Sequence, residues 1–154
     1  DKRGRVSNKA GKCCRRKGGC ALGFDAAILA KMEAMMADGW LSTHILDTAR
    51  GVPAAGIKIM LYRVNGNSHK KITEVVTNAD GRTDAPLLAG KEYRLGSYEL
   101  VFCAGDYLRQ TGQVTGETLF LDEIPIRFGI SDEAAHYHVP LLLSGFGYST
   151  YRGS

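Results

Sequence analysis

The chain has 154 residues, of which 44% are hydrophobic and 23% charged, a composition typical of one compact domain with a real core. Its apolar stretches are too short for a membrane-spanning helix, and its nineteen glycines show no collagen-like period. The net charge of +4 arises in the first 40 residues, which hold nine Lys and Arg against four Asp and Glu, so the remainder lacks the clustered cations of a nucleic-acid-binding groove.

Residues 1–39 are predicted to form a basic flexible arm followed by a short helix. Residues 1–20 contain almost no large apolar side chains, so they cannot bury enough surface to offset the entropy of ordering. A signal peptide is the alternative for residues 21–38, but three charged side chains interrupt its apolar part. A further alternative is an upstream extension that ends near Met36. The apolar side chains at helical spacing are Leu22, Leu29, Met32 and Met36.

Three of the four cysteines, Cys13, Cys14 and Cys20, lie in the basic segment. A structural zinc site usually needs two paired ligand clusters, so this single cluster favours unpaired thiols over a metal site. The fourth, Cys103, lies in an apolar run and is interpreted as a small buried hydrophobic residue. These thiols suit a reducing compartment, and with no clean export signal the cytoplasm is the predicted location.

From Trp40 onward apolar and polar residues alternate, which is the period of β-strands. Turn residues separate the alternating runs, and one brief helix is predicted at Ala104–Gln110. Seven or more short strands are typical of an antiparallel β-sandwich, so residues 40–154 are predicted to form one all-β domain. The predicted strands are Leu41–Asp47, Ile57–Val64, Lys71–Thr77, Ser97–Cys103, Ile124–Ile130, Ala135–Leu143 and Tyr148–Arg152.

Two of these strands carry histidines. His44 lies in the middle of the first, and a single strand histidine is most often a structural residue. His136 and His138 share one face of the strand Ala135–Leu143, but the pattern offers no third ligand, so a zinc site is the weaker interpretation. Pro140 in the same strand has no N–H to donate, which predicts a sheet edge, a bulge or a neighbouring subunit at this point.

Other residues add little by pattern alone. Arg82 follows the turn Asn78-Ala79-Asp80-Gly81 and would usually be a solvated charge. The closing residues keep aromatic side chains up to Tyr151, which predicts a docked strand because frayed termini are generally polar. The sequence contains no nucleophile elbow, no glycine-rich phosphate loop and no His-Glu-x-x-His motif.

Three separated segments carry a more specific signal. They are Leu41–Asp47 with Arg50-Gly51-Val52-Pro53-Ala54, then Thr77–Arg82, and then His136–Ser144 running to the closing Tyr151-Arg152-Gly153-Ser154. In this order they resemble the 5-hydroxyisourate hydrolases, transthyretin-related enzymes of urate breakdown, over residues 40–154. The resemblance implies a transthyretin-like sandwich of two four-stranded sheets, assembled as a homotetramer with active sites between its dimers.

The resemblance also implies the site residues. His44, Arg82 and His138 match the family's catalytic positions, where transthyretin has lysine, glutamate and threonine. Ser154 matches the catalytic tail that lines the pocket and offers either its hydroxyl or the terminal carboxylate as an acceptor. The residues expected to contact the substrate are Tyr151 and, as a neighbouring group, His136.

The implied reaction opens the six-membered ring of 5-hydroxyisourate at an amide bond, giving 2-oxo-4-hydroxy-4-carboxy-5-ureidoimidazoline without a metal or other cofactor. It needs a nucleophilic water, stabilisation of a tetrahedral oxyanion and a proton for the departing nitrogen. Histidine suits the proton transfers because its reference pKa is about 6.5, and the sequence leaves open which histidine is the base. Arg82 offers a planar fork of donors to a carbonyl or an anion.

Two other functions remain open at this point. A transthyretin-like protein could carry a small aromatic ligand without turnover, and a monomeric chain would favour an interaction module. The expected partners are a small-molecule substrate and further copies of the chain, with no nucleic acid and no membrane. One departure from the family is Gly145, which stands where proline is common and loosens that loop.

Overall fold

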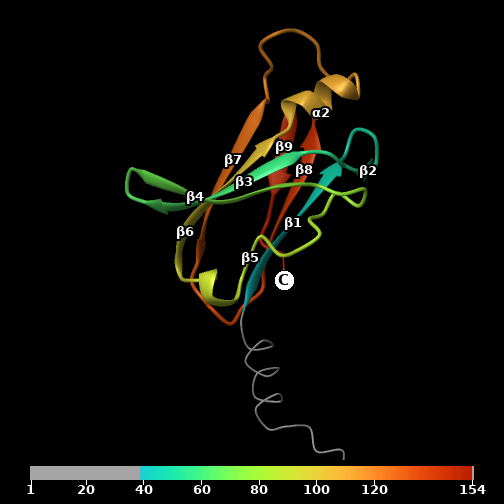
Figure 1. The fold of residues 1–154 in the computed structure, drawn as a ribbon. Coiled ribbons are helices and arrows are strands. Elements are labelled where there is room, and N and C mark those ends of the chain that lie inside the picture. The colour runs from blue at the N-terminus through green and yellow to red at the C-terminus, as the bar shows by residue number, and fades with distance from the viewer. Residues whose placement is uncertain (1–38, 154) are drawn as a thin grey trace, which may run out of the picture.

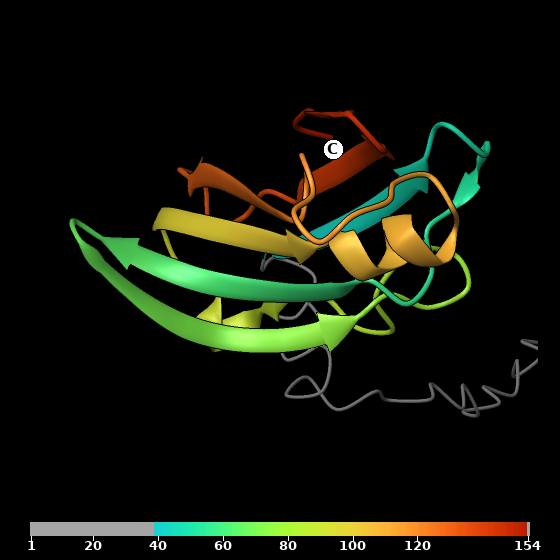
Figure 2. The same cartoon turned by 90° about the horizontal axis from the view of Figure 1, so that it is seen from above.

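The computed structural model describes residues 39–153. They fold into two β-sheets that pack face to face (Figures 1 and 2). One sheet has the order β2 (Val52–Pro53), β1 (Trp40–Asp47), β8 (Tyr137–Ser144) and β9 (Gly147–Thr150), and β5 (Leu88–Ala89) also pairs with β1. The other sheet has the order β4 (Ser68–Val76), β3 (Lys58–Asn65), β6 (Gly96–Cys103) and β7 (Glu123–Ile130).

The predicted sandwich is confirmed, and each of its predicted strands is present with its ends moved by a few residues. The predicted helix is α2 (Gly105–Gln110). Sequence reasoning missed β2, β5 and the short 3₁₀ helix η1 (Gly90–Glu92), because two or three residues are too few for a periodicity. The predicted arm, helix and cysteine cluster of residues 1–38 lie outside the described residues. No helix of the described part is long and apolar enough to cross a membrane.

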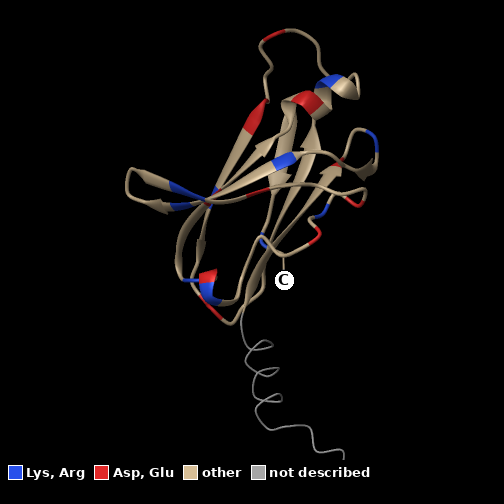
Figure 3. Ribbon diagram, in the orientation of Figure 1, with Lys and Arg blue, Asp and Glu red and all other residues tan. Residues whose placement is uncertain are grey.

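The core lies between the sheets and takes alternate residues from every long strand. Leu41, Ile45 and Leu141 of the first sheet are fully buried against residues such as Phe102 of the second. The intervening residues of β1 and β8 point outward, and most of them are half-buried, with Trp40 exposed and Pro140 buried. Neither β8 nor β9 contains a Lys, Arg, Asp or Glu residue (Figure 3). The outer face of the first sheet therefore carries no lysine, arginine or carboxylate side chain along these two strands.

One pair of strands departs from the predicted antiparallel pattern. β1 and β8 run parallel, and their register places Ser42 beside His138 and His44 beside Pro140. Ser42 and His138 lie 96 residues apart in the sequence. The parallel pairing thus brings the first and the next-to-last strand of the domain together and sets their outward side chains on one face.

Pro140 lies within a central strand, so the prediction of a sheet edge applies only to the local side of β8 at this residue. β8 is flanked by β1 on one side and β9 on the other. The pairing towards β9 runs from Ser144 to Leu141 and then stops, and it resumes with a single bridge between His138 and Gly153. Because proline has no N–H, the interruption opposite Pro140 is the physical consequence of its missing donor.

A buried carboxylate fixes the end of β1 to the helix. Asp47 is almost completely buried and accepts hydrogen bonds from Tyr107 Oη at 2.7 Å and Gln113 Nε2 at 2.8 Å. It also accepts the backbone N–H groups of Ala49 and Arg50. A buried carboxylate is stable only when it is well hydrogen-bonded, so this network holds α2 against the first sheet.

Candidate active site

Two of the sequence-predicted residues and a serine lie together on the outer face formed by β1 and β8. His44 points outward from β1, and His138 points outward from β8, beside Ser42 in the parallel register. All three side chains are half-buried. The strand alternation that buries the core residues on one face therefore presents these polar side chains on the other.

Ser42 is a site residue that sequence reasoning missed. Its Oγ lies 2.7 Å from His136 Nε2 and 2.8 Å from His138 Nδ1, so one hydroxyl contacts both rings. The alternation alone could have found it, because Ser42 lies two residues before His44 and shares its face. What the sequence did not reveal is that His138 would be its neighbour on the adjacent strand.

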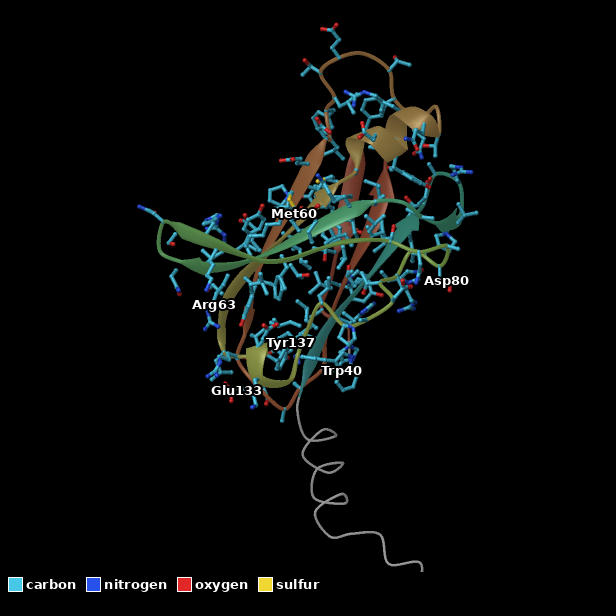
Figure 4. All side chains as sticks on the ribbon, in the orientation of Figure 1. Trp40, Met60, Arg63, Asp80, Glu133 and Tyr137 are labelled. Carbon is cyan, nitrogen blue, oxygen red and sulfur yellow. The ribbon has the colours of Figure 1, made fainter. Side chains whose placement is uncertain are left out.

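His136 lies just before β8 and is held by an aromatic neighbour. The indole ring of Trp40 stacks on its imidazole, with ring centroids 4.3 Å apart and planes inclined by 19°. The rings of His136 and His138 are 6.0 Å apart, and Ser42 lies between them. Figure 4 labels Trp40, which is the first residue of β1.

Arg82 is brought to the open flank of β1 by a tight turn. The side-chain oxygen of Asn78 accepts the N–H groups of Asp80 and Arg82, which closes the turn. Gly81 adopts a φ of +68°, and a Cβ there would lie 2.4 Å from the carbonyl oxygen of Ile45, so only glycine fits. The turn pairs the backbone of Arg82 with that of His44.

Arg82 also changes the titration of the site histidines. Burial lowers the pKa of His44, and the positive charge of Arg82 lowers it further. Burial also lowers the pKa of His138, with Arg82, His136 and His44 adding to the effect in that order. Both imidazoles are therefore held in the neutral form at neutral pH, in which a ring nitrogen is free to accept a proton.

The end of the chain contacts the same histidine. The N–H of Gly153 donates to the carbonyl oxygen of His138 at 2.8 Å, and a Cβ on Gly153 would lie only 2.9 Å from the ring carbon Cδ2 of His138. Tyr151, predicted to line the site, is 59% exposed at the interruption opposite Pro140. Ser154 lies outside the described residues.

A small pocket adjoins this cluster on the flank of β1. It has a volume of about 200 Å³ and lies between Trp40 and Ser42 on one side and the loop Arg82–Pro86 on the other. Among residues 39–153, no group of three or more His, Cys, Asp or Glu side chains is arranged to hold a metal ion. The site thus combines neutral imidazoles, a hydroxyl and an arginine whose backbone is held beside His44, which are groups for proton transfer and anion stabilisation.

Comparison with known proteins assigns the fold to a family. The model of the HIUase/Transthyretin family matches residues 41–153. The chain belongs to this family. A family relative from Mesorhizobium japonicum, named 5-hydroxyisourate hydrolase, is 62% identical over 123 residues, which are 79% of this chain and 98% of the relative.

Two solved structures extend the comparison within the HIUase/Transthyretin family fold. The 5-hydroxyisourate hydrolase of Klebsiella pneumoniae is 35% identical, with a TM-score of 0.58, over 75% of this chain and 99% of that one. An (S)-allantoin synthase is 44% identical with a TM-score of 0.72 over 84% of this chain. The chain spans 48% of the length of that synthase.

Proposed function

We propose that this chain hydrolyses 5-hydroxyisourate to 2-oxo-4-hydroxy-4-carboxy-5-ureidoimidazoline, a step of urate breakdown. The observation that best supports this activity is that His44, Arg82 and His138 lie together on one face of a chain from the HIUase/Transthyretin family. The relative from Mesorhizobium japonicum that is named 5-hydroxyisourate hydrolase supports the same activity, because this chain matches nearly the whole length of that relative.

The proposed mechanism uses the two imidazoles for proton transfer. A neutral ring nitrogen of His138 or His44 removes a proton from water, and the hydroxide adds to the ring carbonyl of the substrate. The guanidinium of Arg82 orients the substrate and stabilises the oxyanion, since it keeps its charge throughout. The amide C–N bond then breaks, and an imidazolium returns a proton to the departing nitrogen. The lowered pKa values of both histidines support the role of base.

The remaining predicted residues complete the proposal. Tyr151 contacts the substrate, and Ser154 supplies an orienting acceptor at the same pocket. The backbone bridge between Gly153 and His138 supports this role, because Ser154 directly follows Gly153 in the sequence. His136 acts as a neighbouring group through its contact with Ser42.

We further propose a homotetramer with active sites between dimers, working in the cytoplasm. The site lies on an outer face of the sandwich, where Trp40 is 42% and Tyr151 59% exposed in the single chain. A facing subunit would cover these side chains and exclude water from the substrate. Light scattering coupled to size-exclusion chromatography tests the assembly, and a monomer would refute it.

The activity test is direct. 5-Hydroxyisourate is generated from urate with urate oxidase, and its ultraviolet absorbance is followed with and without the chain. Accelerated decay is expected for the wild type, with a loss of at least about 100-fold in His138→Ala, because a general acid–base group contributes that much. His69→Ala, in the exposed β3–β4 hairpin, is the matched control and should keep full activity. Saturable binding of the substrate without acceleration would instead identify a transthyretin-like carrier.

A further inference from the structure

One hydroxyl group joins two histidines that belong to the same segment of chain. The distances from Ser42 Oγ to His136 Nε2 and His138 Nδ1 are 2.7 and 2.8 Å, and both are normal hydrogen-bond lengths. The contact is held from both sides, since Ser42 and His138 are register partners in β1 and β8 and the ring of His136 is stacked on Trp40.

We propose that Ser42 is a positioning residue that transfers a proton between His138 and His136 during hydrolysis, an inference that rests on the proposed role of His138. A serine hydroxyl has one proton to donate. With both rings neutral, Ser42 therefore donates to one ring nitrogen and accepts the N–H of the other. The tautomer of one histidine consequently fixes the tautomer of the other.

The proton transfer begins from the tautomer in which Nε2 of His138 is free to act as a base. His138 Nδ1–H donates to Ser42 Oγ, the Ser42 hydroxyl donates to His136 Nε2, and His138 Nε2 carries no proton. When Nε2 takes a proton from water, one O–H bond of the water breaks, the hydroxide adds to the substrate carbonyl and His138 becomes an imidazolium. The Nδ1 proton then moves to Ser42 Oγ while the hydroxyl proton moves to His136 Nε2.

This transfer leaves His138 neutral with its proton on Nε2, and His136 holds the positive charge. In the second half of the reaction Nε2–H protonates the departing ring nitrogen of the substrate. At the same time His136 returns its Nε2 proton to Ser42, and Ser42 returns its own to His138 Nδ1. The starting tautomers are restored, and the proton taken from water ends on the product.

The surroundings of the two rings favour the positive charge on His136. Burial lowers the pKa of both histidines, and at His138 the charge of Arg82 adds to this effect, followed by His136 and His44. Within residues 39–153, no charged neighbour adds to the effect of burial at His136. The indole face of Trp40, 4.3 Å away, also attracts a cation. Moving the charge to His136 therefore relieves repulsion next to Arg82.

The first test removes the hydroxyl. Ser42→Ala is expected to lower kcat by about 10- to 100-fold with KM within about twofold, because the proposal assigns the Ser42 hydroxyl to proton transfer and not to holding the substrate. Ser42→Thr keeps a hydroxyl and should recover most of the rate. Ser97→Ala, an exposed serine of β6 in the other sheet, is the matched control. A kcat of Ser42→Ala within twofold of the wild type would overturn the proposal.

The second test asks whether Ser42 and His136 act as one unit. His136→Phe keeps a ring for stacking on Trp40 but has no nitrogen to accept a proton. It should also reduce kcat. The double variant with Ser42→Ala should have about the same kcat as the less active of the two single variants. Full multiplication of the two losses would show independent roles and would also overturn the proposal.

A measurement without substrate separates this proposal from the proposed function. Nitrogen NMR of the imidazoles reports the tautomer and titration of each histidine in the intact chain, and circular dichroism confirms that each variant is folded. Ser42→Ala should change the signals of His136 and His138 and leave those of His69 unchanged. Unchanged signals at both site histidines would overturn the Ser42 connection. A wild-type chain that fails to hydrolyse 5-hydroxyisourate would instead refute the proposed function, and the NMR result would still decide the connection.

Discussion

Gly153 packs so closely against His138 that one added methyl group is expected to displace the imidazole. In Gly153→Ala the new Cβ would lie 2.9 Å from Cδ2 and 3.1 Å from Cβ of His138, whereas ordinary contacts begin near 3.4 Å. We expect the His138 side chain to move by about 0.5 Å to relieve this contact. Because a misplacement of about 1 Å can cost about 100-fold in rate, we expect kcat/KM to fall about 10-fold, or about 1.4 kcal/mol of transition-state stabilisation.

The same assay of 5-hydroxyisourate decay measures this loss. Gly147→Ala in β9 is the matched control, because its Cβ would meet only Ser144 Oγ at an ordinary 3.7 Å. Gly153 is not one of the glycines with left-handed φ, and the hydrogen bond from its N–H survives the change, so the melting temperature should stay close to that of the wild type. If Gly153→Ala hydrolyses the substrate as fast as Gly147→Ala, the contact does not position His138.

Two further predictions concern charge and stability. In the wild type, kcat/KM should fall only below the ordinary histidine range, because burial and then Arg82 lower the pKa of His44 and His138 and the neutral ring is the base. Arg82→Gln removes one lowering charge, so the acidic limb should move to higher pH, and an unmoved limb in the pH–rate profile would contradict this reasoning. Tyr107→Phe deletes the hydrogen bond to buried Asp47 and should cost about 1.5–3 kcal/mol in urea denaturation. Tyr148→Phe, at an exposed tyrosine, should cost little by comparison.

The alternation of the sequence predicted the long strands because burial of one face imposes a period of two. It also placed His136 and His138 on one face, since only one residue separates them. The parallel pairing of β1 with β8 was beyond this reasoning, because a period identifies a strand and not its neighbour. Ser42 was missed for that reason, although it shares a face with His44.

Pro140 shows a second limit of sequence reasoning. A missing N–H is visible in the sequence, but which neighbouring strand loses a hydrogen bond depends on the order of strands in the sheet. In the structure the interruption falls on the side of β9, where Tyr151 lies opposite Pro140. The family resemblance supplied what periodicity could not, since it selected Arg82, an exposed residue that pattern alone would call a solvated charge.

The long separation between Ser42 and His138 has a consequence for how activity is acquired. The hairpin β3–β4 and the pair β6–β7 join segments that are near in sequence, whereas the contacts of Ser42 span 94 and 96 residues. Non-local contacts form slowly, because the entropy of closing the intervening loop is lost before they stabilise the chain. During refolding, strand content should therefore return before turnover does, and during synthesis the site stays incomplete until β8 can pair with β1.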